Sequence, residues 1–152
     1  SREISCAIMT IEGLVLFEAH EKAGTLEIRR ALPPFDSSEF AQNMVRDIKL
    51  IFFPPEGLPQ KSGFFPTGER VCRWHSQDTV IDVLETAEEK AEIKSYTNCG
   101  KLKRQIRLSN KMNHYYQYIE LHGREWADYS LRLSLIEVQT VSSQNKNNLR
   151  TK

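Results

Sequence analysis

Two residue types that commonly bind zinc come close together once, at Cys72 and His75. A zinc site needs further ligands, and Cys99 and His114 would have to supply them from elsewhere in the chain. No spacing supports that set, and side chains three residues apart in a strand point to opposite faces. We therefore expect neither a metal nor a cofactor.

The three cysteines, Cys6, Cys72 and Cys99, lie far apart and form no C-x-x-C pair. The favoured interpretation is three unpaired thiols, partly in the core. A bridge between Cys72 and Cys99 is conceivable in an oxidising compartment, so whether they pair stays open.

Asp82 is a candidate acid or base, because it lies inside an apolar run, where burial would raise its pKa. The commoner role of such a residue is a hydrogen bond at a sheet edge. No nucleophile elbow, H-E-x-x-H, phosphate-binding loop or dinucleotide fingerprint occurs. We expect a non-enzymatic protein with no catalytic residue; a hydrolase would require Asp82 beside a histidine in a cleft.

The stretch Lys101–Arg107 alternates basic and apolar residues, and tyrosines at 115, 116 and 118 follow it. This pattern is compatible with single-stranded nucleic acid, with an anionic lipid surface, or with basic residues that guard a sheet edge. A net charge of +1 favours the guarded edge, so we expect no nucleic-acid partner. Lys101, Lys103 and Arg107 remain candidates for docking a protein.

The composition, 39% hydrophobic and 27% charged over 152 residues, is that of an ordinary globular chain. It predicts a single domain over 1–141 and a disordered C-terminal tail over 142–152. No apolar run approaches the length of a membrane span, and no export-signal pattern is visible. The chain is therefore expected to be cytosolic, or a trimmed form of an exported protein.

Alternation of apolar and polar residues predicts strands first at Ala7–Ala19, with Gly13 at a bulge or bend, and at Thr25–Leu32. Further strands are expected at 69–75, 79–84, 92–97, 101–108, 115–121 and 129–141, with a turn over 109–113. A helix across Thr79–Ile93 is the alternative for that region. In Tyr129–Val141 the apolar phase slips at Leu135-Ile136, which predicts a bulge.

Helical spacing appears over Phe35–Phe53, where Asp36 and Glu39 fit a capping box and Phe35 and Phe40 a hydrophobic staple. The helix is expected to end near Lys49, with Leu50–Phe53 as a plausible short strand. One face is apolar and the other polar. The apolar face carries Phe40, Met44, Val45, Ile48 and Ile51; the polar face carries Gln42, Asn43, Arg46, Asp47 and Lys49.

These elements predict an α+β fold, a curved antiparallel half-barrel of eight or nine strands covered by one main helix. A gap between sheet and helix would form an apolar cavity. The residues expected to line it are Val15, Phe17, Phe40, Met44, Ile48, Trp74, Leu131 and Leu133. Phe64 and Phe65 lie in a Gly/Pro-rich loop, Glu56–Gly68; we expect them to be tucked under it, and they are the candidates for a lid.

The order of these elements resembles the LolA/LolB-type lipoprotein-carrier fold of the bacterial cell envelope. The similar stretches are IEGLVLFEA, LEIRRALPP with the helix that follows, GKLKRQIRLSN and YSLRLSLIEVQ. The resemblance implies a protein of the periplasm or outer membrane that shelters acyl chains of a lipid or acylated protein in an apolar cavity. The chain is short for that family and shows no lipobox.

We therefore expect an apolar-ligand carrier of the cell envelope, with lipid or acylated protein as partner. The alternative is a protein-interaction domain that docks a partner through a sheet edge or the basic strand Lys101–Arg107. Neither the ligand nor the oligomeric state follows from the sequence.

Overall fold

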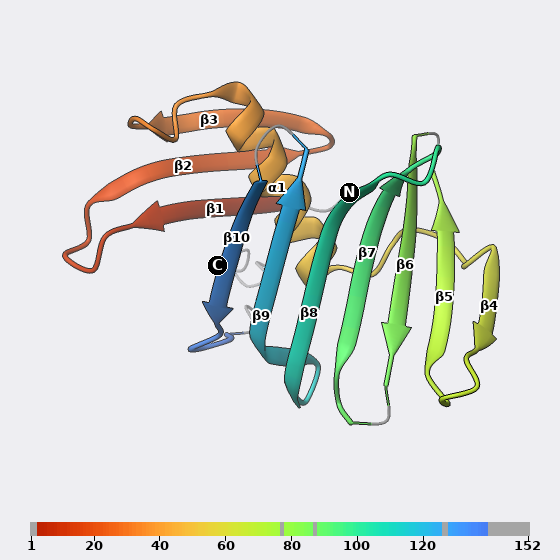
Figure 1. Ribbon diagram of the computed structural model, residues 1–152. Coiled ribbons are helices and arrows are strands. Elements are labelled where there is room, and N and C mark those ends of the chain that lie inside the picture. The colour runs from red at the N-terminus through yellow and green to blue at the C-terminus, as the bar shows by residue number, and fades with distance from the viewer. Residues whose placement is uncertain (1–2, 77, 87, 126–127, 140–152) are drawn as a thin grey trace, which may run out of the picture. The chain divides into compact units, whose positions relative to one another are not determined.

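The computed structural model describes residues 3–76, 78–86, 88–125 and 128–139. Within them it contains ten strands and one helix, in two antiparallel sheets that do not close into a barrel (Figure 1). The α+β class is confirmed, although the fold is mostly β and has ten strands rather than eight or nine. The chain divides into two compact units, Ser1–Gln60 and Lys61–Lys152, which are described separately.

The first unit is a three-stranded sheet followed by the helix. Its strands are β1 (Glu3–Met9), β2 (Val15–Lys22) and β3 (Thr25–Ala31), and its helix is α1 (Ser38–Phe52). The prediction of one long strand over Ala7–Ala19 is wrong, because the chain turns back between Met9 and Val15. Gly13, with a φ of +89°, lies in that turn and donates its N–H to the Thr10 carbonyl at 3.0 Å.

Helix α1 packs on β2 through a small hydrophobic core. Phe17, Ala19 and Ala41 are almost completely buried, and the rings of Phe17 and Phe40 meet edge-to-face with centroids 5.4 Å apart. The residues that pack around these buried positions are Cys6, Ile8, Leu26, Ala31, Phe35, Phe40 and Met44.

The ends of α1 differ from those predicted. Ser37, not Asp36, is the N-cap, and its Oγ accepts the N–H of Phe40 at 3.0 Å. The helix continues past Lys49 to Phe52, so the alternative short strand is absent. It stops where Phe53 turns extended, as expected for a residue that precedes a proline. Phe35 and Phe40 contact each other, with ring centroids 5.2 Å apart.

The polar face assigned to α1 is also partly wrong, because Asn43 and Asp47 are buried. Arg46 donates to the Asn43 side chain at 3.2 Å. Lys49, at the helix end, pairs with the buried Glu21 of β2 at 2.6 Å. Polar contacts therefore join the hydrophobic ones that attach α1 to its sheet.

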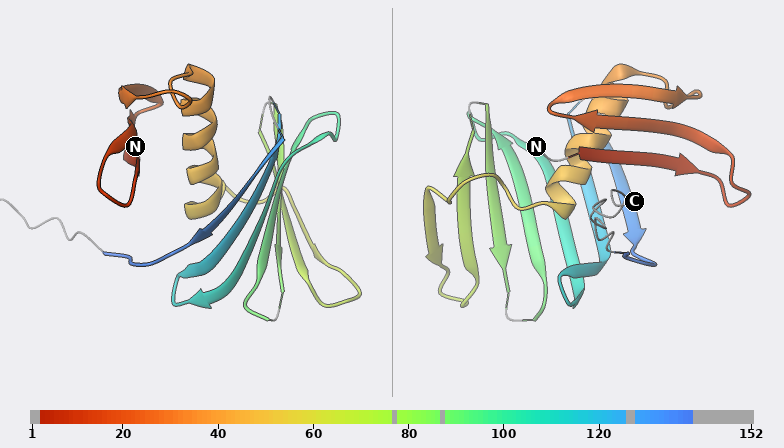
Figure 2. Two further views of the ribbon diagram at one scale, coloured as in Figure 1. Left: turned by 60° about the vertical axis from the view of Figure 1, so that its left-hand side comes forward. Right: turned by 180° about the vertical axis from the view of Figure 1, so that it is seen from behind.

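The second unit is a seven-stranded antiparallel meander (Figure 2). Its strands follow chain order from one edge to the other: β4 (Lys61–Phe64), β5 (Arg70–His75), β6 (Thr79–Glu85), β7 (Ala91–Thr97), β8 (Leu102–Met112), β9 (Tyr115–Arg124) and β10 (Asp128–Ser134). The helix alternative across Thr79–Ile93 is excluded. Strand β8 also runs through most of the predicted turn at 109–113.

The predicted bulge at Leu135-Ile136 is wrong, because β10 ends at Ser134. The backbone N–H of Leu135 makes one further bond, to the Gln117 carbonyl at 2.8 Å. Residues 140 and 141 of that predicted strand, and the tail at 142–152, lie outside the described residues.

A bulge does occur in β8, at a position that the alternation did not reveal. Ser95 faces Arg104, whereas the next residue, Tyr96, faces Leu102, so Lys103 is the extra residue. Leu102 and Arg104 consequently lie on opposite faces of the sheet.

Candidate functional site

The two faces of the seven-stranded sheet differ in chemistry, because side chains alternate between them and the strands are in register. On one face, two apolar rows cross the sheet. The first row is Cys72, Val83, Ile93, Ile106, Leu121 and Leu131. The second is Ala91, Leu108, Ile119 and Leu133. We call this surface the apolar face.

Exposure along the apolar face rises at its outermost strand. Ile106 and Leu121 are completely buried, whereas Leu131 and Leu133 on β10 are 44% and 43% exposed. Because β10 is the last strand of the sheet, one of its edges has no strand partner in the described part of the chain. Half-exposed apolar side chains therefore occur on β10 together with backbone N–H and C=O groups that have no partner strand in the described part of the chain.

The opposite face, which we call the polar face, carries one polar row from edge to edge. The row is Lys61, Arg73, Asp82, Lys94, Gln105, His122 and Ser130, one residue from each strand. A parallel row alternates in charge through Glu92, Arg107, Glu120 and Arg132. Arg132 pairs with Glu120 at 3.3 Å, and Arg107 with Glu92 at 3.7 Å.

The first hollow on the polar face, with a volume of about 380 Å³, lies over β4–β7. At its base Arg73 donates from Nε and Nη2 to the two oxygens of Asp82, both at 2.6 Å. Asp82 is buried, while Arg73 keeps 44% of its side chain exposed. The hydrogen bond and charge of Asp82 raise the pKa of Arg73, so the guanidinium stays charged.

The expected environment of Asp82 is therefore corrected in one respect. It is buried in a hollow, but its partner is an arginine, and no histidine lines that hollow. The condition set for a hydrolase is not met there. Asp82 also lies on β6, inside the sheet and not at an edge.

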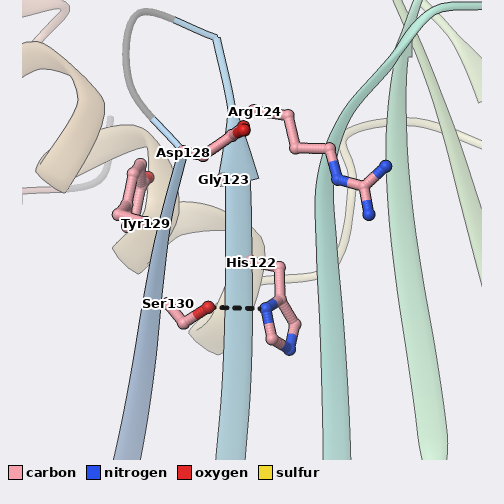
Figure 3. Close-up of a pocket in the computed structure, with 6 residues that line it drawn as sticks. All are labelled: His122, Gly123, Arg124, Asp128, Tyr129 and Ser130. Carbon is pink, nitrogen blue, oxygen red and sulfur yellow. Dashed lines mark hydrogen bonds between the residues drawn. The ribbon is translucent and has the colours of Figure 1, made fainter.

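A second hollow, of about 370 Å³, lies where β9 ends and β10 begins (Figure 3). His122 Nδ1 and Ser130 Oγ are 2.8 Å apart across the two strands, and the Arg124 side chain points away from Tyr129. A similar pair, Ser5 and His20, joins β1 and β2 at 2.9 Å, and His20 also contacts Glu3 at 3.2 Å. Both are polar cross-strand contacts at the surface of a sheet.

The predicted cavity residues fall into two groups. Phe40 and Met44 pack against the buried cluster that contains Phe17 in the first unit, where Val15 and Ile48 are half-buried. Trp74, Leu131 and Leu133 belong to the second unit, with Trp74 half-buried. None of these eight residues lines either hollow described above.

Phe64 and Phe65 are not tucked under their loop: Phe64 ends β4 and is 76% exposed, and Phe65 is 44% exposed. Phe65 lines the hollow over β4–β7. Its placement beside charged residues was not predicted.

The basic strand is β8, which has a partner strand on both sides. The idea that its lysines and arginines guard a sheet edge is therefore wrong. Lys103 pairs with Glu125 at 2.9 Å and Arg107 with Glu92 at 3.7 Å. Lys101 donates its backbone N–H to the Thr97 hydroxyl at 3.0 Å. Two of the three predicted docking residues thus face acidic partners.

Arg104 is the residue whose role the pattern least revealed. It is 1% exposed, the largest completely buried side chain in the described chain, and its Nη1 contacts Glu125 at 2.5 Å. Its neighbours in register are the small residues Ser95 and Gly123. Small residues on both sides leave room for a guanidinium on the apolar face. The sequence signal was the interruption of an apolar series by one arginine.

The three cysteines are unpaired, and the candidate metal ligands do not come together. Cys6, Cys72 and Cys99 are free thiols, half-buried, buried and exposed respectively. Among the residues that the structure describes, no cluster of three histidine, cysteine or acidic side chains could hold a metal ion. Within that same part of the chain, no helix has the length and apolar character to cross a membrane.

Comparison of the chain with protein-family models, with curated proteins and with solved structures finds no match. The resemblance to lipoprotein carriers therefore stays a prediction, and function is argued from the residues themselves.

Proposed function

We propose that the protein is a non-enzymatic binding protein that shelters the acyl chains of a lipid or an acylated protein. The observation that carries this proposal is the pair of apolar rows, which end on the half-exposed Leu131 and Leu133. Burying apolar surface contributes about 25 cal/mol per Å², or about 0.8 kcal/mol per CH₂ group. The interior of the rows is buried, so an acyl chain would lie against Leu131 and Leu133, where apolar contact alone would hold it.

The half-barrel covered by α1, which the sequence predicts, is part of this proposal. In it the apolar face forms the wall of the cavity, and Phe64 and Phe65 are candidate lid residues. A location in the periplasm or at the outer membrane follows from the same proposal, as does a lipid or acylated-protein partner.

The test is native mass spectrometry of the purified protein, together with titration of a fluorescent fatty acid. We expect co-purifying lipid and saturable binding of the probe. Leu131→Ser with Leu133→Ser should weaken binding by roughly tenfold or more, because each half-exposed leucine offers about 1 kcal/mol of apolar contact. Arg132→Ser, on the same strand and the other face, is the matched control and should bind normally. Absence of both lipid and probe binding would refute the proposal.

A second candidate function is docking of a protein partner at the edge of β10. The described part of that strand is largely exposed, and its outer backbone groups are available for strand addition. Ser130→Pro would remove a backbone donor. If partner binding needs the edge, it should fall in Ser130→Pro and survive in the double leucine variant, which is the reverse of the result expected for acyl binding.

A further inference from the structure

The hollow over β4–β7 has two chemically different sides. Along one row lie Lys61, Arg73, Asp82 and Lys94, in register across four strands. In the adjacent row lie Gly63, Val71 and Leu84, also in register, and Ser62, Phe65 and Tyr96 complete the lining. Rows two residues apart in a strand are separated by roughly 6.8 Å, which is the span of a small molecule. A charged strip therefore runs beside an apolar strip.

The charged strip is cationic at its surface. Asp82 is buried and engaged by two nitrogens of Arg73, so its charge is neutralised and the guanidinium is held in one orientation. Lys61 is exposed, and Lys94 pairs with Glu92 at 2.6 Å. Asp82 offsets Arg73, and Glu92 offsets Lys94, so among the cations that line the hollow Lys61 supplies the remaining positive charge; Arg107, which also contacts Glu92 at 3.7 Å, does not line the hollow. That balance suits a ligand with a single negative charge.

Tyr96 adds a donor to the same strip. Burial raises the pKa of its phenol, which therefore stays protonated at neutral pH. A phenol hydroxyl can donate a hydrogen bond to an anion and place its ring against an apolar group.

Gly63 accounts for the open space. A Cβ added there would meet nothing within 4 Å, and its backbone needs no left-handed conformation. A larger side chain at this position in β4 would fill space in the hollow without touching the charges.

We propose that this hollow binds a small organic monocarboxylate with an apolar body, of about the size of phenylacetate. The carboxylate lies on Arg73 and Lys61, and the apolar body lies on Val71 and Leu84 beneath Phe65. This site is on the polar face, so it does not depend on acyl binding at the apolar face.

The test is a titration of the full chain with phenylacetate in low-salt buffer, followed by NMR chemical-shift changes or calorimetry. We expect saturable one-to-one binding. 2-Phenylethanol, which has the same ring without the charge, should bind at least about tenfold more weakly, as expected when a charge-assisted hydrogen bond is lost. Equal binding of the two compounds, binding of inorganic phosphate in preference to phenylacetate, or no binding of phenylacetate would overturn the proposal.

Two variants locate the site. Gly63→Val should abolish phenylacetate binding while the circular dichroism spectrum is retained, and Lys61→Gln should weaken binding about tenfold. Lys90→Gln, an exposed lysine in a turn outside the hollow, is the matched control and should bind normally. Unchanged binding in Gly63→Val and Lys61→Gln would place phenylacetate elsewhere and overturn the assignment. If Gly63→Val does not fold, the binding measured for Lys61→Gln tests the assignment by itself.

Discussion

The ring of Tyr129 on β10 lies over the backbone of Gly123 on β9. The two residues are cross-strand partners, and a Cβ added at Gly123 would come within 2.7 Å of the Tyr129 phenol oxygen and closer still to the ring. An aromatic side chain that covers a glycine in the neighbouring strand restores packing that the glycine itself lacks. It attaches the exposed edge strand β10 to the interior of the sheet.

This contact predicts that Gly123→Ala destabilises the protein by about 1–3 kcal/mol, because the new methyl group displaces the tyrosine ring. The free energy of unfolding is measured by urea denaturation. Gly63→Ala, in a strand and with open space around it, is the control and should leave stability within about 0.5 kcal/mol. If the two variants are equally stable, the ring does not occupy this position.

The buried Arg104 predicts an asymmetric response to mutation. Glu125→Ala removes a carboxylate from a guanidinium that is 1% exposed, and should cost about 3 kcal/mol. Arg104→Met replaces the buried ion with an apolar side chain of similar length and should cost less. Urea denaturation of both variants tests the order. Glu88→Ala, which breaks an exposed pair with Lys90, should leave the urea midpoint unchanged.

The lowered pKa values of the Glu125 and Glu92 carboxyls also predict that the protein loses stability in acid. For each carboxyl, burial acts to raise the pKa, but hydrogen bonds and nearby charges outweigh it and the pKa is lowered. The partners are Lys103 and Arg104 for Glu125, and Lys94, Gln105 and Arg107 for Glu92. A lowered folded pKa gives stability that is present above the unfolded value, about 4.3, and is lost as the pH falls through the folded pKa.

The free energy of unfolding should therefore be flat just above pH 5 and fall below about pH 4.3. Denaturation curves at a series of pH values measure it. In a Glu92→Gln Glu125→Gln double variant the acid-dependent fall should be smaller, since neither side chain can then bind a proton. An identical slope in both proteins would show that other carboxyls cause it.

The sequence predicted six of the seven strands of the second unit, because each of the six is an alternating run bounded by turn residues, but it assigned β4 to the loop Glu56–Gly68. The strand prediction also failed in the first unit, where the alternation of apolar and polar residues continues through a turn. Met9 and Val15 are cross-strand partners and so share a face, and an odd number of residues separates them. Apolar spacing therefore continued without interruption across the hairpin, and Gly13 was assigned to a bend within one strand.

Cross-strand partners were the main feature that sequence could not supply. Arg73 and Asp82 are nine residues apart, and only the register of β5 and β6 brings them together. The bulge at Lys103 likewise depends on pairing with β7 and leaves no mark in the alternation of β8. Sequence patterns indicated which residues of one strand share a face. Predicting the ion pairs and the hollow would also have required knowledge of which residues pair between neighbouring strands.

The start of α1 shows the limit of local patterns and gives a final prediction. Asp36 and Ser37 are adjacent, and both residue types cap helices, so spacing alone favoured Asp36 through Glu39. The structure instead places the Ser37 Oγ 3.0 Å from the Phe40 N–H. Ser37→Ala should cost about 1 kcal/mol, because the side-chain acceptor for that N–H is lost.

Asp36→Ala and Ser38→Ala are the neighbouring controls, and thermal or urea unfolding compares the three variants. Asp36 precedes the cap and Ser38 is the first helical residue, so neither supplies the cap bond and each should change stability by less than about 0.5 kcal/mol. A larger loss in Asp36→Ala than in Ser37→Ala would restore the capping box that the sequence predicted. The expected order, with Ser37→Ala least stable, follows from the 3.0 Å bond to Phe40.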